Sequence, residues 1–261
     1  MIVLIPVAGL GNRIRVVCSC YQFCKENNKV MSIKWMREPG FNASWNDLFE
    51  YPNGIVINNH SVLNYFLYSN PSIKNLYVSK LLDKITNRQI YYSLYKDSLS
   101  SLTNNGKLYI NTYCQQGELC CINELFKPNK FLRTKIDALT DKFSEETIGL
   151  HIRTTDNEES KSVSTIDKFE SRIDKYIIDH PTATFFLCTD NLNIKDKLKN
   201  KYKNRIITYN SVLNRNSTLG IQDAVVELWS LASTKEIWGS YYSSYTDMAS
   251  SIYGSQLEII K

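Results

Sequence analysis

The sequence predicts an α/β fold in which two Rossmann-like lobes face each other across a cleft. At the N-terminus an apolar run, a glycine turn and a helical pattern follow one another, as they do at the start of an α/β unit. Strands and helices then alternate regularly through the second half of the chain, which is typical of a parallel, doubly wound sheet. The length of 261 residues allows one large or two small domains, and either can bury a core.

The first lobe is predicted to span residues 1–143. Its elements in chain order are a strand at 2–7, a helix at 13–25, a strand at 30–35, a strand at 108–112 and a helix within 128–143. Between residues 37 and 97 short apolar runs alternate with Asn-rich turns, so the pattern places few elements there.

The second lobe is predicted to span residues 144–261 and is more regular. Strands are expected at 147–152, 184–189, 205–208, 235–239 and 257–260, and helices at 166–178, 192–202, 221–232 and 245–253. In such sheets ligands bind outside the carboxyl ends of the strands, so we expect a ligand in the cleft between the lobes.

The composition excludes several classes of protein. Hydrophobic residues make up 43% and charged residues 22%, which is ordinary for globular chains and excludes disordered, collagenous and coiled-coil chains. The apolar runs are far shorter than a membrane span, so no integral membrane segment is expected. The net charge of +5 suits an anionic ligand but is too small to indicate nucleic-acid binding.

The seven cysteines predict free thiols. Their number is odd, and a chain of this size needs no disulfide framework. No basic region precedes the N-terminal apolar run, so this run is interpreted as a buried strand and not as a signal peptide. We therefore expect a cytoplasmic location, either free or at the surface of a membrane.

The N-terminal glycine turn resembles a dinucleotide-binding turn only in part. Gly9 and Gly11 are present, but Ile14 stands where the third glycine is needed, and Arg37, not an acidic residue, follows the second strand. The turn still brings backbone N–H groups and Asn12 to the start of a helix, where an anion or a polar group can bind. A plain strand-to-helix turn explains the same residues.

The strongest polar group follows the strand at 147–152. Alternation along the strand predicts His151, Arg153 and Thr155 on one face. An arginine at the end of a strand is suited to a phosphate, since its planar fork forms bidentate, charge-assisted hydrogen bonds. The structural alternative is an internal ion pair between Arg153 and Asp156.

Two further strands end in polar side chains. Thr189 and Asp190 end the strand at 184–189, although Asp190 could simply cap the next helix. Ser243, Ser244 and Tyr245 begin the helix after the strand at 235–239, where a serine-rich turn is both an anion site and an ordinary helix cap. All of these residues are predicted to lie at the same edge of one sheet.

Four segments resemble successive donor-site motifs of the α1,6-fucosyltransferase-like superfamily, and the segment at 9–15 is similar to the N-terminal glycine turn of its members. This superfamily contains the nodulation and N-glycan-core fucosyltransferases and, more distantly, the α1,2- and protein O-fucosyltransferases. The resemblance covers roughly residues 1–30 and 145–255, and residues 37–140 contribute nothing to it. The segments are 9–15 (GLGNRIR), 151–156 (HIRTTD), 188–190 (CTD), 223–232 (DAVVELWSLA) and 239–245 (GSYYSSY).

The resemblance implies a GT-B fold, with the acceptor on the first lobe and the nucleotide sugar on the second. It also implies GDP-fucose as donor, inversion at the anomeric carbon and no metal ion or other cofactor. It assigns the β-phosphate to Arg153, the guanosine to His151 and Asp223, and the phosphates to Ser244. Gly11 and Asn12 would flank the pyrophosphate or the acceptor.

The chain departs from the family pattern at two positions. Thr154 stands where the family commonly has a second arginine, and Tyr245 stands where it often has glutamine. The chain is also short for the family, so the acceptor lobe is expected to be reduced.

The implied chemistry agrees with the residues present. Cleavage of the sugar–phosphate bond leaves negative charge on the nucleotide, which a fixed guanidinium and helix N-terminal N–H groups can stabilise, and the sugar passes through an oxocarbenium-like state. The sequence has no Asp-x-Asp motif and only three histidines, which disfavours a metal-dependent transferase. The acceptor hydroxyl needs a base, for which Asp156, Glu158 and Glu159 are the candidates, with Asp156 preferred.

The sequence therefore predicts a fucosyltransferase that binds a nucleotide sugar and a glycan acceptor. Three alternatives remain open at this point. They are a transferase of the same fold with another nucleotide-sugar donor, a non-catalytic nucleotide- or glycan-binding module, and a nicotinamide oxidoreductase, which the missing third glycine opposes. Acceptor identity, linkage and oligomeric state cannot be predicted from these residues.

Overall fold

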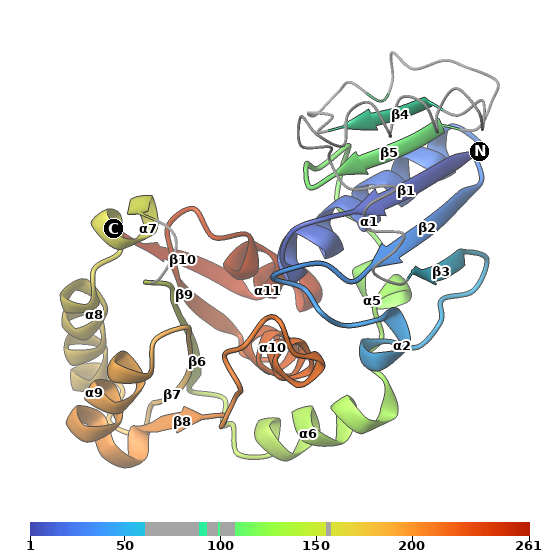
Figure 1. The fold of residues 1–261 in the computed structure, drawn as a ribbon. Helices are drawn as coiled ribbons and strands as arrows, with labels where there is room; N and C mark the ends of the chain where they lie inside the picture. Colours follow the sequence, from blue (N-terminus) through green and yellow to red (C-terminus); the bar gives the residue numbers. More distant parts are fainter. Residues whose placement is uncertain (61–88, 93–98, 100–107, 155–157) are drawn as a thin grey trace. The chain divides into compact units, whose positions relative to one another are not determined.

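The computed structural model describes residues 1–60, 89–92, 99, 108–154 and 158–261. The chain forms two compact units (Figure 1). Unit 1 consists of Met1–Asn129 and Asn214–Gln222, and unit 2 of Lys130–Leu213 and Asp223–Lys261. This division lies earlier in the chain than the boundary expected at residue 143, and it returns one later segment to unit 1.

Unit 1 contains a parallel sheet whose strands lie in the order β3-β2-β1-β5-β4. The strand–helix–strand start expected from the sequence is confirmed, with ends shifted by a few residues. Its strands and helices are β1 (Ile2–Pro6), α1 (Leu10–Glu26), β2 (Met31–Met36), α2 (Trp45–Leu48), β3 (Val56–His60), β4 (Gln89–Tyr92), β5 (Leu108–Thr112) and α5 (Ile122–Leu125).

The position of β1 explains its continuous apolar sequence. It pairs with β2 on one side and β5 on the other, and all five of its residues are buried. A parallel strand covered on both faces has no solvent side and needs no alternation of polar residues.

An aromatic cluster fills unit 1 beside β2, in a region where the sequence pattern was irregular. The Trp35 and Trp45 rings meet edge to face with centroids 5.0 Å apart. Such pairs are stabilised beyond their burial by about 0.5–1.5 kcal/mol. The other rings of the cluster are Phe41, Phe49 and Phe126.

Unit 2 also contains a parallel sheet, in the order β10-β9-β6-β7-β8 (Figure 1). The predicted bounds of β6, β7 and α9 are confirmed to the residue. Its elements are α6 (Lys130–Thr140), β6 (Thr147–Ile152), α7 (Glu158–Val163), α8 (Ile166–Asp179), β7 (Thr184–Thr189), α9 (Leu192–Tyr202), a 3-10 turn (Lys203–Arg205), β8 (Ile206–Thr208), α10 (Thr218–Ala232), β9 (Glu236–Ser240), α11 (Ser244–Tyr253) and β10 (Gln256–Ile260).

The two faces of β6 have different neighbours. Leu150 and Ile152 belong to a core that includes Phe169 of α8 and Leu198 of α9. On the other face, a Cβ added to Gly149 would lie 2.7 Å from Leu231 Cδ1 of α10, well inside normal contact. The alternation predicted for this strand therefore separates its apolar face from a face that helix α10 approaches closely.

Candidate functional site

The sheet of unit 2 has a topological switch point between β6 and β9. The chain proceeds from β6 to β7 and β8 on one side, and then crosses to β9 and β10 on the other. Ligands of doubly wound sheets bind outside the carboxyl ends of the strands at this point. Arg153 follows β6 and Ser243 follows β9, so two of the predicted site residues lie next to the switch point.

His151, near the end of β6, is buried and held by α11. Its Nδ1 atom lies 2.6 Å from Thr246 Oγ1, and its ring centroid is 4.9 Å from that of Tyr245. The pKa of His151 is lowered to about 4, chiefly by burial; the charge of Asp190 opposes this shift and that of Arg153 adds to it. The imidazole is therefore neutral at pH 7 and can both donate and accept a hydrogen bond.

The backbone that follows β6 is fixed from both neighbouring strands. The Arg153 N–H donates to Ser240 Oγ over 3.0 Å, and this hydroxyl donates to the His151 carbonyl over 3.2 Å. On the other side the Thr154 N–H donates to Asp190 Oδ1 over 3.0 Å. The side chain of Arg153 therefore starts from a rigid backbone, which is what a charge-stabilising group requires.

Asp190 is not the cap of the next helix, which corrects the alternative interpretation of that residue. Asn191 caps α9, because its Oδ1 accepts from the N–H of Asn193 over 3.0 Å and from that of Ile194. The Asn191 amide also donates to Thr154 Oγ1 over 3.2 Å. Asp190 and Asn191 together hold Thr154, and Thr189 accepts from the Asn191 N–H.

The N-terminus of α11 combines two features of an anion site. Its first-turn N–H groups carry the positive end of the helix dipole. Ser243 occupies the N-cap position but makes no side-chain cap bond, and its buried hydroxyl has no hydrogen-bond partner among the described residues. Because an unpaired buried hydroxyl costs about 1–3 kcal/mol, this group is a candidate donor to a ligand, and its contact with phosphate stays a prediction. Ser244 is the first residue of the helix.

Tyr245 supports His151. Its hydroxyl donates to the Ala224 carbonyl over 2.7 Å, which fixes the ring against the imidazole. Tyr245, which stands where the family that the sequence resembles often has glutamine, thus packs against His151.

Asp223 lies in a buried network. Its Oδ1 accepts from the Tyr209 hydroxyl and its Oδ2 from the Val212 N–H, both over 2.9 Å. The ammonium group of Lys135 lies 3.7 Å from Oδ1. Asp223 thus holds the segment that follows β8, and its contact with guanosine stays a prediction.

Sequence reasoning missed Glu227 and Lys195, which extend this network. The Ser211 hydroxyl donates to Glu227 Oε1 over 3.0 Å, and the Lys195 ammonium lies 4.0 Å from the same oxygen. Burial raises the pKa of Glu227 to about 7. A carboxylate one helical turn after Asp223, within an otherwise apolar helix, was the signal that could have identified it.

In unit 1 the glycine turn is held by Arg13, which is fully buried. Its Nε donates to the Ala8 carbonyl over 2.8 Å and its Nη1 to the Met36 carbonyl over 2.9 Å. Its Nη2 donates to Glu38 Oε1 over 2.6 Å, and the same oxygen accepts from the Ala8 N–H. Burial lowers the pKa of Arg13 to about 10, so the guanidinium stays charged at pH 7. Glu38 is therefore an acidic residue that follows β2, but its carboxylate binds Arg13. In a dinucleotide site the corresponding carboxylate would bind a ribose.

Gly11 and Asn12 lie in the first turn of α1, directly after β1. The switch point of this sheet lies between β1 and β5, so the turn is at the expected ligand edge. The Arg15 Nη2 donates to Asn12 Oδ1 over 2.5 Å. This bond fixes the orientation of the amide and leaves its nitrogen as the outer donor.

Comparison with known proteins gave matches among solved structures alone. No family model matches the chain, and no curated protein matches it. NodZ α-1,6-fucosyltransferase soaked with GDP-fucose is 14% identical, with a TM-score of 0.61 over 95% of this chain and 91% of that chain. FUT1 of Arabidopsis thaliana in complex with GDP is 12% identical, with a TM-score of 0.61 over 98% and 69% of the chains. POFUT1 in complex with GDP is 10% identical, with a TM-score of 0.58 over 98% and 97%.

The chain has a fucosyltransferase-like GT-B fold. This confirms the predicted fold class. Because the sequence identities are low, the similarity to these proteins shows the fold alone. Within the GT-B fold, the switch point of unit 2 brings together the residues after β6 and β9 that the sequence singled out.

The catalytic base Asp156 and a mechanism without a metal ion stay predictions. Thr155 and Asp156 lie outside the described residues, and Glu158 and Glu159 begin α7. Among the residues that the structure describes, no group of three or more His, Cys, Asp or Glu side chains could hold a metal ion. In the same part of the chain, each helix is too short or too polar to cross a bilayer.

Proposed function

We propose that the chain is an inverting, metal-independent glycosyltransferase that transfers fucose from GDP-fucose to a hydroxyl group of a glycan. The observation that carries this proposal is the convergence of neutral His151, Arg153 and the N-terminus of α11 at the switch point of unit 2. The GT-B neighbours described above, solved with GDP-fucose or GDP, support the choice of donor.

The leaving group is the GDP diphosphate. As the bond between the fucose carbon and the β-phosphate oxygen breaks, negative charge develops on that phosphate. Arg153 would neutralise this charge with its guanidinium, while the N–H groups of Ser244 and its neighbours and the unpartnered Ser243 hydroxyl would donate hydrogen bonds. One preorganised donor of this kind is worth about 10²–10³ in rate.

The nucleoside would contact His151 and Asp223. His151 is neutral, so it can hydrogen-bond to a ribose or a base without competing with Arg153 for negative charge. The carboxylate of Asp223 can accept hydrogen bonds from the N–H groups of guanine.

The acceptor hydroxyl would attack the anomeric carbon from the face opposite to the leaving GDP, which inverts the configuration. Its proton must pass to a base, for which we propose Asp156. Gly11 and Asn12, at the ligand edge of unit 1, would flank the pyrophosphate or the acceptor.

No metal ion is proposed, because Arg153 and the helix N-terminus supply the positive charge. Addition of EDTA should therefore leave turnover of GDP-fucose unchanged. The seven free thiols support a reducing, cytoplasmic location.

Two experiments test this function. A thermal-shift series with GDP, UDP and NAD should show stabilisation by GDP alone, since a ligand at 100 times its Kd adds about 2.7 kcal/mol. GDP-fucose should then be hydrolysed slowly, and transferred to a suitable glycan. Stabilisation by UDP in place of GDP would indicate another nucleotide-sugar donor, and stabilisation by NAD alone would exclude the transferase.

A second candidate is a non-catalytic nucleotide- or glycan-binding module, which Thr154 favours. This position commonly carries a second arginine in the family that the sequence resembles, whereas Thr154 is hydrogen-bonded to Asp190 and Asn191. GDP binding without any hydrolysis or transfer of GDP-fucose would support the module.

A further inference from the structure

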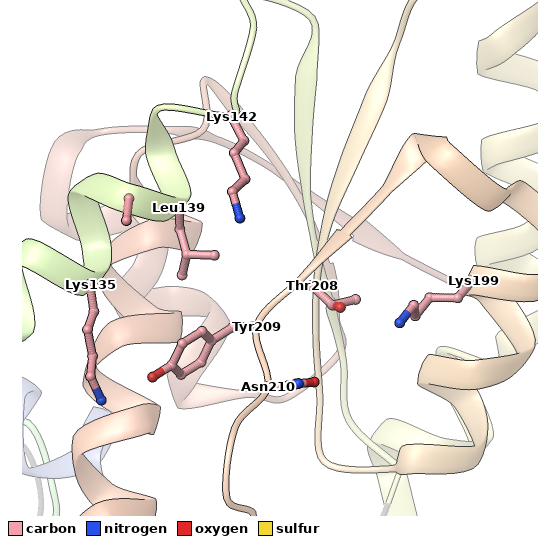
Figure 2. A pocket seen from close by; sticks show the side chains of 8 residues that line it. Lys135, Leu139, Lys142, Lys199, Thr208, Tyr209 and Asn210 are labelled. Atoms are coloured by element: carbon pink, nitrogen blue, oxygen red, sulfur yellow. The ribbon is translucent and has the colours of Figure 1, made fainter.

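Unit 2 has a groove at the end of β8, the outer strand of its sheet (Figure 2). The groove has a volume of about 470 Å³ and lies between the C-terminal half of α6 and helix α9. In the sheet order, β7 separates β8 from β6, so the groove is distinct from the switch point. Its lining residues are Lys135, Ala138, Leu139, Lys142, Lys199, Thr208, Tyr209 and Asn210.

Two of the lining lysines carry uncompensated charge. Figure 2 shows Lys142 extending into the groove from the end of α6, and Lys199 extending toward Thr208 from α9. Neither ammonium group has an ion-pair partner in the part of the chain that the structure describes. By contrast, Lys197 and Lys201, on either side of Lys199 in the helix, bind Glu170 of α8 over 2.6 and 3.0 Å.

The third lysine is already balanced. Lys135 lies 3.7 Å from Asp223 Oδ1 and 4.6 Å from the centre of the Phe131 ring. None of the described residues that line the groove carries a carboxylate, so Lys142 and Lys199 determine its charge. A groove with two unpaired ammonium groups favours an anionic ligand.

The remaining lining suits a sugar. The Tyr209 hydroxyl donates to Asp223, which holds its ring in place, and Leu139 adds an aliphatic surface. Aromatic and aliphatic faces pack against the C–H face of a sugar ring, while Thr208 and Asn210 offer hydrogen bonds to its hydroxyl groups. The volume lies in the range of small-molecule sites and exceeds what a single inorganic anion fills.

We propose that this groove binds an anionic carbohydrate, a sugar that carries a phosphate, sulfate or carboxylate group. Lys142 and Lys199 bind the charged group, and Tyr209 packs against the ring. Tyr209 and Lys135 contact Asp223, one of the residues assigned to GDP-fucose, but Lys142 and Lys199 are not among those residues. The existence of the site does not depend on that assignment.

A competing explanation is that the lysines protect the free edge of β8. Charged side chains, lysine above all, commonly prevent an outer strand from pairing with another chain. This explanation predicts increased self-association when the lysines are removed, and no binding of sugars.

The test uses the full chain and isothermal titration at low salt. The probes are glucose 6-phosphate, glucose 6-sulfate and glucuronate, with glucose and inorganic phosphate as references. The variant is Lys142→Ala combined with Lys199→Ala. The matched control is Lys168→Ala combined with Lys175→Ala, which removes the same charge from exposed positions of α8. GDP affinity is measured on the same samples.

At least one charged sugar should bind to the wild type and to the control with equal affinity. Its affinity for the groove variant should be about tenfold lower, which corresponds to a loss of about 1.4 kcal/mol in binding free energy. Comparison of the three sugars identifies the charged group. Glucose and inorganic phosphate should each bind at least about tenfold more weakly than that sugar. GDP affinity should be the same in all three proteins, whatever the outcome for the proposed transferase.

Absence of binding by all three sugars would overturn the proposal, as would an equal loss in the control. Inorganic phosphate that binds as tightly as the sugars would reduce the groove to a simple anion site. Increased self-association of the groove variant without any change in sugar binding would assign the lysines to edge protection.

Discussion

The Nδ1 atom of His151 lies 2.6 Å from Oγ1 of Thr246, and this contact joins the end of β6 to helix α11. Thr246 reaches the imidazole because it packs directly on Gly239, whose missing Cβ leaves the space. Gly239 is also the residue of β9 that pairs in register with His151. One glycine, one threonine and one histidine therefore set the geometry between the two segments that follow β6 and β9.

Thr246→Val should destabilise the protein and weaken GDP binding. The substitution keeps the shape of the side chain but leaves the buried imidazole without this partner, which costs about 1–3 kcal/mol. Urea unfolding measures the loss, and titration with GDP measures the binding. Thr246→Ser keeps the hydroxyl and should recover most of both; equal behaviour of the two variants would show that the hydrogen bond is unimportant.

Gly239→Ala should have a similar effect by a steric route. The added methyl group would overlap the Thr246 side chain, and overpacking of this kind costs about 1–3 kcal/mol. Gly117→Ala is the control, because a Cβ there would meet only the Ser19 carbonyl, at 3.5 Å. If both variants melt at the wild-type temperature, α11 can move away from β9 and the close packing is not required.

Arg153→Ala should lower kcat/KM for GDP-fucose far more than it lowers affinity for GDP. The charge on the leaving phosphate is largest in the transition state, so the expected loss there is about 3–4 kcal/mol. Steady-state kinetics and GDP titration measure the two effects. Arg153→Lys keeps the charge without the planar fork and should be intermediate. Turnover near the wild-type value in Arg153→Ala would remove this residue from the mechanism.

Glu227 and His151 should give opposite pH dependences of stability. Burial raises the pKa of Glu227 from 4.5 to about 7, so the folded protein keeps a proton that the unfolded chain loses, and stability falls as pH rises through this range. Burial lowers the pKa of His151 from 6.5 to about 4, so stability falls as pH drops through that range. Where the two ranges overlap, the slopes oppose each other.

Glu227→Gln should therefore gain stability relative to the wild type as pH rises from about 4.5 to 7, by about 3 kcal/mol in total. Urea unfolding at a series of pH values measures the difference between the two curves. Asp196→Asn, which removes an exposed carboxylate of α9, is the control variant. A curve for Glu227→Gln that runs parallel to that of the wild type would show that this carboxyl group titrates normally.

Arg13→Met should destabilise unit 1 by about 3 kcal/mol or more, because it leaves the partly buried Glu38 carboxylate without its cation. Arg37→Met is the matched control. It breaks an ion pair with Asp47 in which the arginine side chain is 40% exposed, and such pairs are worth at most about 1 kcal/mol. Thermal unfolding of both variants measures the contrast, and similar melting temperatures would contradict a structural role for Arg13.

Local pattern predicted the elements of unit 2 because its central strands are short, mostly apolar segments bounded by polar residues. β6 and β7 lie between other strands in the sheet and are covered on both faces, so their bounds coincide with the change in hydrophobicity. The residues that follow these strands were identified for the same reason, since the end of an apolar run marks where a polar side chain can begin to serve a site.

The sequence by itself determined where the strands end, and therefore that Arg153, Asp190 and Ser243 lie at one edge of a parallel sheet. The tertiary structure alone decided which of them share partners: Asp190 with Thr154, Glu38 with Arg13, and Glu227 with Lys195. The physical reason is that these partners come together through the order of the strands and the packing of helices. The periodicity of side chains shows whether a residue faces the core. It does not show which residue, distant in the sequence, that side chain contacts.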